Sequence, residues 1–231
     1  MKKTIRILCL IGLLLLPLTA SAANYATFYR FGDREENRVA ITIDDWYEPA
    51  LLTDFMAVAD EYGVKLTCYP CGFNLHEEDR ALWQAYLDAG HEIGSHGYVH
   101  MRYTERGAAQ IARDYQKFEA ALDKTLGYHY EFLTVRVPYG AGLGQGGSGK
   151  VGRAVHAAGF DNVVFWDYDK TNNVPEALKK IKNGSVVLMH ANRHDLKYFK
   201  NLMEGLKDRG YEYVTVSELF HLTTRLNESA S

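Results

Sequence analysis

The chain has 231 residues, of which 47% are hydrophobic and 24% are charged, and its formal net charge is −3. These values are typical of a soluble globular chain and argue against intrinsic disorder, a collagen-like repeat and a protein with several membrane spans. Three of the 26 basic residues and none of the 29 acidic ones precede Ala23. The rest of the chain is therefore acidic, which argues against a nucleic-acid partner.

The first 22 residues have the pattern of a secretion signal. Three basic side chains within the first six residues precede an apolar run over 7–18, and Ala20, Ser21 and Ala22 supply the small residues of a cleavage site. The apolar run is shorter than the roughly 20 residues that cross a bilayer. We therefore expect a signal peptide over 1–22, a single domain over 23–231, no membrane span after cleavage, and a secreted or periplasmic location.

Runs rich in β-branched residues alternate with helical stretches along the rest of the chain. In chain order, strands are expected over 38–44, 64–69, 91–96, 132–137, 162–166, 185–190 and 211–215. Helices are expected from Pro49 onward and over 105–126, 174–181 and 195–209. The alternation indicates parallel βαβ units, arranged either as a closed or distorted barrel or as an open doubly wound sheet.

Two short motifs favour structural over chemical roles. The glycine-rich stretch 140–152 contains a GxxxxGK pattern, but Val151 stands where a phosphate-binding loop needs Ser or Thr, so we expect a mobile loop and no nucleotide partner. Cys68 and Cys71 form a CxxC at the end of a strand, without a second pair to complete a zinc site. We expect a structural pair, oxidised or reduced, rather than a redox centre.

Side chains with acid, base or metal-binding chemistry follow the carboxyl ends of five expected strands. They are Asp44 and Asp45, His96 and His100, Arg136, Asp167 and Asp169, and His190. In βα folds these strand ends meet on one face, where the connecting loops form the active site. We therefore expect these side chains to converge.

A metal site is the first expectation. His96 and His100 stand four residues apart, so a helical turn would point both imidazoles to one side. With one of the two adjacent aspartates they would form a three-ligand site with a position open for water, as in hydrolytic metal centres. The other aspartate would face that water, kept ionised by Arg136. His190 follows an apolar strand that would hold its ring in the same pocket.

In the order of these residues the chain resembles the polysaccharide deacetylase family, carbohydrate esterase family four, also called the NodB homology domain. The resemblance runs from about residue 38 to residue 219. The matching blocks are TIDD at 42–45, GHEIGSHGYVH at 90–100, RVPYG at 136–140, a weak block at 166–169 and LMH at 188–190. The resemblance implies a distorted (β/α) barrel of seven or eight units and a metal-dependent hydrolase that removes acetyl groups from N-acetylated sugars of a glycan.

The resemblance also assigns roles to single residues around the metal. Asp45, His96 and His100 would hold a divalent ion, most commonly zinc, although cobalt and nickel suit the same ligands. Asp44 would be the catalytic base that takes a proton from the attacking water, and Arg136 would tether it.

The remaining roles concern the acyl group and the sugar. The backbone N–H of Tyr139 would stabilise the oxyanion, and His190 would act as general acid toward the leaving amine. The rings of Tyr139 and Trp166 are candidates for contact with the substrate.

The sequence departs from the family pattern at two places. Trp46 follows the aspartate pair where the family usually has glycine, so we expect a large aromatic at the rim that stacks on a sugar or narrows the cleft. An Asp-Trp pair that orients the acid histidine in the family falls on Asn172 and Asn173. Asp169 is therefore the candidate to orient His190.

Four other functions are weighed as alternatives. Two histidines and a carboxylate also hold iron in oxygenases, but those usually have all-β folds. A two-carboxylate glycosidase would leave His96, His100 and His190 without a role. A catalytically impaired carbohydrate-binding protein on the same fold would need none of Asp44, Arg136 and His190, and a deacylase of a non-glycan or O-acetyl substrate would use them all.

Overall fold

The computed structural model describes residues 24–46, 48–169 and 173–226. The expected signal peptide over 1–22 and Asn172 lie outside these ranges. Within them, none of the helices has both the length and the apolar character needed to cross a membrane.

Strands and helices alternate along the described chain. The strands are β1 (Thr27–Tyr29), β2 (Arg38–Asp45), β3 (Leu66–Pro70), β4 (Glu92–Ile93), β5 (Asn162–Val164), β6 (Tyr168–Asp169), β7 (Ser185–His190) and β8 (Glu212–Tyr213). The α-helices are α1 (Leu51–Glu61), α2 (Arg80–Asp88), α3 (Ala108–Leu126), α4 (Lys150–Ala157), α5 (Val174–Lys180), α6 (Arg193–Leu206) and α7 (Val216–Leu219). The expected α/β class is confirmed.

The strands form an irregular parallel barrel. Five of them pair in the order β4-β3-β2-β7-β6, with β8 against the first residues of β2, while β1 pairs with β5. Single parallel bridges from Ser95 to Val135 and from Val135 to Val163 continue the pairing from the end of β4 to β5. Only a few residues separate β5 from β6 in the chain, so these two strands lie at adjacent positions. The strands therefore form a ring, which is closed by regular hydrogen-bond pairing over only part of its circumference.

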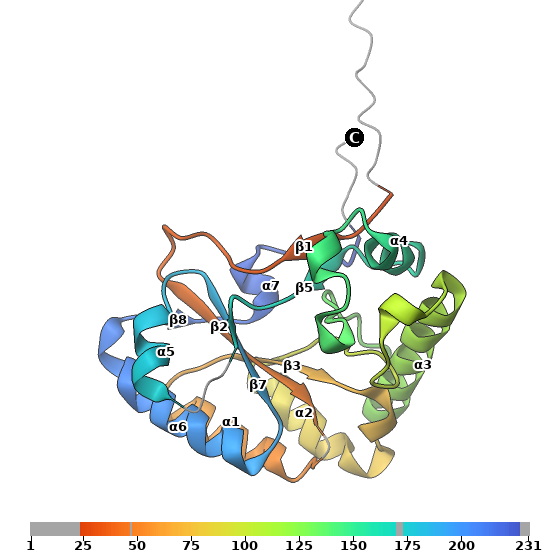
Figure 1. Cartoon of the computed structure of the whole chain (residues 1–231). Coiled ribbons are helices and arrows are strands. Elements are labelled where there is room, and N and C mark those ends of the chain that lie inside the picture. Colours follow the sequence, from red (N-terminus) through yellow and green to blue (C-terminus); the bar gives the residue numbers. More distant parts are fainter. Residues whose placement is uncertain (1–23, 47, 170–172, 227–231) are drawn as a thin grey trace, which may run out of the picture.

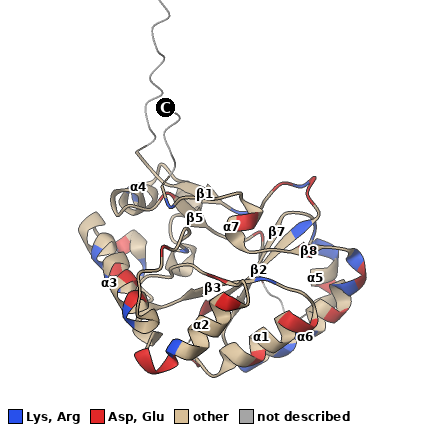
Figure 2. Ribbon diagram, turned by 180° about the vertical axis from the view of Figure 1, so that it is seen from behind, with Lys and Arg blue, Asp and Glu red and all other residues tan. Residues whose placement is uncertain are grey.

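The helices cover the outside of this ring. Neighbouring helices contact one another in the order α5, α6, α1, α2, α3 and α4, and Figure 1 shows them along the outer side of the central strands. Charged residues gather on these helices and on the loops, whereas most of the strand residues are uncharged (Figure 2). The polar residues within the strands are therefore the exceptions that need an explanation.

The central strand β2 separates two packed regions. Ile41 and Ile43 belong to the large cluster formed with the helices, whereas Ala40 packs in a smaller cluster with residues of β3, β5 and β7. Since side chains alternate along a strand, Thr42 and Asp44 share the face of Ala40. The last aspartate of the expected strand thus points away from the helices and into the ring.

Several expected strands are shorter in the structure, and in two of them the hydrogen bonds show why. The strand expected over 91–96 is regular only at β4, because the N–H of Gly94 bonds to β3 while that of Ser95 bonds to Thr134. The strand expected over 132–137 keeps one bridging residue, Val135, which pairs with both neighbours. The chain changes partner within each segment, so neither forms a continuous ladder.

The glycine-rich stretch is more ordered than expected. Its end begins α4, in which Val151, Ala154 and Val155 form a buried helical face, and Lys150 donates a hydrogen bond to the carbonyl of Thr104. The spacing of those three apolar residues was masked by the glycines around them. Strands β1 and β6 and helices α2 and α7 were also not predicted.

Cys68 and Cys71 are separate thiols in the structure, and both are buried. Burial raises the pKa of each thiol above its ordinary value. Protonated, enclosed thiols are poor nucleophiles, so the structure favours a packing role over redox chemistry and does not contain the disulfide allowed by the sequence.

Gly94→Ala should destabilise the fold by about 1–3 kcal/mol, since it forces extra volume into a packed core. An added Cβ would lie 2.3 Å from Cε1 of Tyr69, whose ring is fully buried, and 2.9 Å from Oγ1 of Thr134. Gly144→Ala is the matched control, because its Cβ would meet no atom within 4 Å. Urea unfolding measures both variants, and equal stabilities would contradict the close approach.

Candidate metal centre and catalytic pocket

The carboxyl ends of the strands enclose a cavity of about 360 Å³. Its lining residues are Asp44, Asp45, His96, His100, Val137, Tyr139, Gly140, Trp166, Asp169, Leu188 and His190. Most of the side chains that the sequence places at strand ends therefore meet here. Asp167 does not line the cavity and pairs instead with Arg34 at 2.7 Å.

A fully buried guanidinium, that of Arg136, holds Asp44 from the core side. Its Nη1 donates to Oδ1 of Asp44 at 2.8 Å and to Oγ1 of Thr42 at 2.6 Å. Its Nε and Nη2 donate to the backbone carbonyls of Val164 at 3.0 Å and Phe165 at 3.2 Å. A buried charge needs such a set of partners. Oδ1 of Asp44 is thereby occupied, while Oδ2 lies 3.8 Å from Nε2 of His96.

The register of the sheet sets what lies beside Asp44. It is paired with Tyr69 on β3 and with His190 on β7, and its carbonyl accepts a hydrogen bond from Ala191 at 3.0 Å. The candidate base and the candidate acid therefore start from adjacent strand ends. Backbone pairing, rather than loop conformation, fixes their separation.

Asp45 carries a buried carboxylate oxygen close to both histidines. Its backbone has a φ of 77°, which is uncommon for a residue other than glycine. Oδ1 of Asp45 has no hydrogen-bond partner in the described structure, and it lies 3.5 Å from Nε2 of His96 and 3.6 Å from Nε2 of His100. One oxygen and two imidazole nitrogens that converge in this way suit zinc or another divalent transition metal.

The hydrogen bonding of His96 leaves the right nitrogen available for such an ion. Nδ1 of His96 lies 2.8 Å from the backbone carbonyl of Arg136. A carbonyl only accepts, so Nδ1 carries the proton and the neutral ring has its lone pair on Nε2. Burial is the main cause that lowers the pKa of His100, which favours a neutral ring there.

The loop between the two histidines is held by Asp114 of α3. Its Oδ2 accepts the N–H of Tyr98 at 2.9 Å and the hydroxyl of Tyr103 at 2.8 Å, while Oδ1 accepts the N–H of Val99 at 3.2 Å. A Cβ on Gly97 would lie 2.3 Å from Oδ2, so this approach requires glycine. Asp114 was not predicted from the sequence, because an acidic residue within a helix usually marks a solvated face.

The structure brings the carboxylate of Asp195 to His190, whereas Asp169 was the candidate from the sequence. Oδ2 of Asp195 accepts the backbone N–H of His190 at 2.8 Å and lies 3.8 Å from its Nδ1. Asp195 raises the pKa of His190, mainly through this side-chain contact, and outweighs the effect of burial. Asp169 lines the cavity. The spacing of five residues and the Asn192 helix cap, whose side chain accepts the N–H of Asp195, were the missed signals.

Tyr139 forms part of the pocket wall. It lies in the short 3₁₀ turn Pro138–Gly140 with a φ of 59°. The residue is 53% exposed, and its ring centre lies 4.3 Å from that of His100 and 4.2 Å from the guanidinium carbon of Arg102. This ring is therefore open to a ligand in the cavity.

Two tryptophans differ from each other in their exposure. Trp46 was expected at the rim, but it is fully buried and packs edge-on against Phe55 and Trp83 with ring centres 5.6 and 6.0 Å apart. Its φ of 57° turns the side chain into the core, so in this structure it has no face for a sugar. Trp166 is half-buried and lines the cavity as expected. Asn173 caps α5 by accepting the N–H of Glu176.

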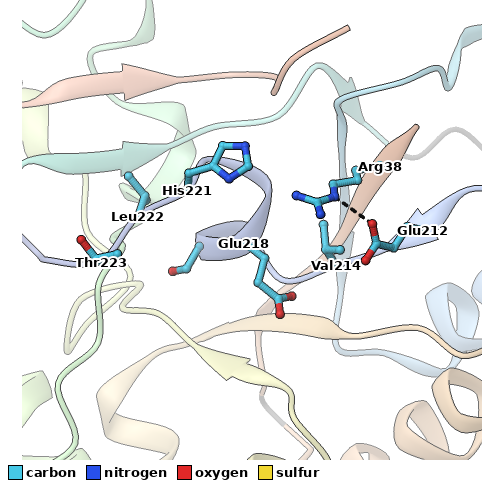
Figure 3. A pocket seen from close by; sticks show the side chains of 8 residues that line it. Arg38, Glu212, Val214, Glu218, His221, Leu222 and Thr223 are labelled. Atoms are coloured by element: carbon cyan, nitrogen blue, oxygen red, sulfur yellow. Dashed lines mark hydrogen bonds and ion pairs between the residues drawn. The ribbon is translucent and has the colours of Figure 1, made fainter. Parts of the chain in front are cut away.

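A second cavity, of about 390 Å³, lies at the opposite ends of the strands, where Arg38 begins β2 and Glu212 begins β8 (Figure 3). Nε of Arg38 lies 2.8 Å from Oε2 of Glu212, and Nε2 of His221 lies 3.1 Å from Oε1 of Glu36. These charged groups already pair with one another. The chemistry is therefore assigned to the other end of the barrel.

Arg136→Gln should lower the free energy of unfolding by about 3–5 kcal/mol, because it leaves the buried carboxylate of Asp44 without its cation. Adding Asp44→Asn should restore part of this loss, since a neutral amide needs no counter-charge. Urea unfolding in EDTA measures both, and the exposed Arg193→Gln is the control. A double variant no more stable than Arg136→Gln would contradict the charge-based explanation.

Comparisons with known proteins agree with this geometry. Residues 31–163, more than half of the chain, match the family model for polysaccharide deacetylase. A bifunctional xylanase/deacetylase of Pseudobutyrivibrio xylanivorans is 25% identical over 222 residues, covering 89% of this chain and 34% of the relative. The peptidoglycan-N-acetylglucosamine deacetylase PgdA of Listeria monocytogenes is 26% identical over 196 residues, covering 81% of this chain and 40% of the relative.

A solved structure shows the same fold over nearly its whole length. It is a peptidoglycan N-acetylglucosamine deacetylase that is 22% identical, with a TM-score of 0.73 over 87% of this chain and 96% of that chain. The chain spans about a third to two fifths of the length of the two curated relatives. With the matching profile, the ordered motifs and the shared fold taken together, this chain belongs to the polysaccharide deacetylase family.

Proposed function

We propose that this chain is a metal-dependent amidase that removes acetyl groups from N-acetylated sugars of a glycan. The observation that carries the proposal is the unpartnered Oδ1 of Asp45, which faces two imidazole nitrogens beside the arginine-tethered Asp44. The family of the chain and the deacetylase activities in the names of its relatives support the same reaction.

Asp45, His96 and His100 would hold the ion, with zinc as the first candidate and cobalt or nickel as alternatives. When bound there, a divalent ion supplies Lewis acidity toward the acetyl carbonyl and lowers the pKa of a water molecule. Two features of the chain prepare this site. The carbonyl of Arg136 orients His96, and Asp114 holds the loop that leads to His100.

The chain's own groups would move the protons. Asp44, whose Oδ1 is held by Arg136, would use its free Oδ2 to take a proton from the attacking water. His190, with its pKa raised by Asp195, would donate a proton to the sugar nitrogen as the C–N bond breaks. The N–H of Tyr139 would donate to the developing oxyanion. Each proton-transfer group is typically worth about 10²–10⁴-fold in rate.

The pocket walls would position the sugar. Tyr139 and Trp166 offer aromatic surface on one side of the cavity, and apolar ring faces stack well on sugar rings. The pattern of residues 1–22 supports a signal peptide and action outside the cytoplasm, in a secreted or periplasmic location.

Acetate release tests the proposal directly. Residues 23–231 should release acetate from N-acetylglucosamine oligomers, EDTA should abolish the release, and zinc should restore it. Asp44→Asn should lower kcat by about 10²–10⁴-fold and still bind the metal. His96→Ala should lose both the activity and the bound metal. Exposed residues supply the controls Asp54→Asn and His76→Ala, which should behave as wild type.

Other outcomes would redirect the assignment. Release from O-acetylated xylo-oligosaccharides alone would replace the amide substrate by an ester. Glycan binding without any release would support the non-catalytic alternative. An Asp44→Asn protein with full activity would contradict the proposed base.

Asp195→Asn should move the basic limb of the pH profile of kcat to lower pH. The contact with Asp195 is the main cause of the raised pKa of His190, so in wild type the proton-donating form persists to higher pH. Without that carboxylate the pKa falls, and the donor form is lost earlier as pH rises. Initial rates from about pH 5 to about pH 10 measure the limb. A shift with Asp169→Asn and none with Asp195→Asn would reverse the assignment.

A further inference from the structure

A small basic cavity opens beside the loop that carries His100. It has a volume of about 230 Å³, and Val99 and Met101, the two neighbours of His100, form part of its wall. Three cationic side chains line it: Arg106, which precedes α3, and Arg113 and Lys117 of α3. Neighbouring residues of one loop thus line both this cavity and the catalytic pocket.

The cations of this cavity have few protein partners, although the Lys117 ammonium lies 5.9 Å from the centre of the Tyr98 ring. None of Arg106, Arg113 and Lys117 takes part in an ion pair among the described residues, whereas Lys124 on the same helix pairs with Glu77 at 2.8 Å. Nε of Arg106 is buried and has no hydrogen-bond partner in the described structure. An unsatisfied buried donor on a charged group is costly, so a bound acceptor would stabilise it.

One acidic side chain, Asp114, also lines the cavity, but it is already engaged. Both of its oxygens accept hydrogen bonds from the loop and from Tyr103. Lys117 lies close enough to lower the pKa of Asp114, although burial is the larger effect and raises it. Three cations against one engaged carboxylate leave the cavity positive, in a chain whose net charge is negative.

Positive charge continues from this cavity to the catalytic pocket. Arg102, next to Met101, has its guanidinium carbon 4.2 Å from the centre of the Tyr139 ring at the pocket wall. Arg102 therefore adds a cation beside the pocket wall, on the same loop whose residues Val99 and Met101 line the basic cavity. Arginine binds carboxylates and phosphates in a bidentate manner, so the lining suits an anionic substituent better than a neutral hydroxyl.

We propose that this basic cavity binds an anionic group, a carboxylate or a phosphate, carried by the glycan near the sugar that is deacetylated. This inference rests on the proposed function and narrows its substrate to an anionic glycan. Neutral oligomers would still enter the catalytic pocket, but without this second contact. The preference for anionic substrates should lower KM and leave kcat unchanged, since the cavity lies outside the reacting groups.

The test compares matched substrates and variants. Acetate release is measured with an N-acetylglucosamine tetramer, with a soluble peptidoglycan fragment bearing lactyl and peptide carboxylates, and with a glycan oligomer bearing phosphodiesters. Arg113→Gln and Lys117→Gln should each raise KM about tenfold for an anionic substrate and leave KM for the neutral tetramer and kcat unchanged. Lys124→Gln is the control. Added salt should weaken the anionic preference of the wild type.

Several results would overturn the inference. Equal effects of Arg113→Gln on charged and neutral substrates, or none on either, would remove the anion site. The carboxylate and phosphodiester arms decide which anion is preferred. Dissociation constants from calorimetry with the same ligands test the cavity without turnover. Charge-dependent binding without acetate release would support the cavity and contradict the proposed reaction alone.

Discussion

The buried guanidinium of Arg136 is the group on which the rest of the site depends. Through its side chain it bonds to Thr42 and Asp44 on β2 and to two carbonyls at and after the end of β5. Through its own carbonyl it fixes the ring of His96. A lysine ammonium is a compact point charge and lacks the planar fork that reaches all these acceptors at once. One residue in an irregular segment thus joins the proposed base, a proposed metal ligand and separate strands.

The two neighbouring aspartates show how backbone conformation divides tasks between identical side chains. Asp44 follows the alternation of side chains along β2 and points to Arg136, so one oxygen of its carboxylate already accepts a hydrogen bond from that guanidinium. Asp45 leaves the strand in the left-handed region, which releases it from that alternation and turns Oδ1 toward the histidines. The difference between a counter-charged carboxylate and an unsatisfied one is therefore set by a single dihedral angle.

Much of this site was accessible from the sequence, because strand ends of a βα fold converge whatever the details of the loops. That rule places Asp44, Asp45, His96 and His190 together without knowledge of the tertiary contacts. Asp195 and Asp114 escaped it, since neither stands at a strand end and each accepts hydrogen bonds, from within a helix, for the segment that precedes that helix. Such roles depend on which donors the fold leaves unsatisfied, and a single sequence does not show this.

The fold was less predictable where the chain changes partner. Val135 forms single bridges to Ser95 and to Val163, and the alternation of polar and apolar residues does not predict such a change of partner. Trp46 was misplaced for a related reason, because polarity patterns presuppose a regular backbone and its φ of 57° follows that of Asp45 at 77°. A bulky residue in this region costs about 1–3 kcal/mol, which the burial of the indole offsets.

That burial has a consequence for how the site can be altered or transplanted. The indole of Trp46 packs against Phe55 on α1 and Trp83 on α2, and Trp46 directly follows Asp45, the proposed metal ligand, in the chain. The orientation of the Asp45 carboxylate therefore depends on the packing of this aromatic core. Transferring only the pocket residues to another barrel would leave behind the packing that orients Asp45. Substitutions in this aromatic core would likewise change the orientation of Asp45 without altering any residue of the pocket.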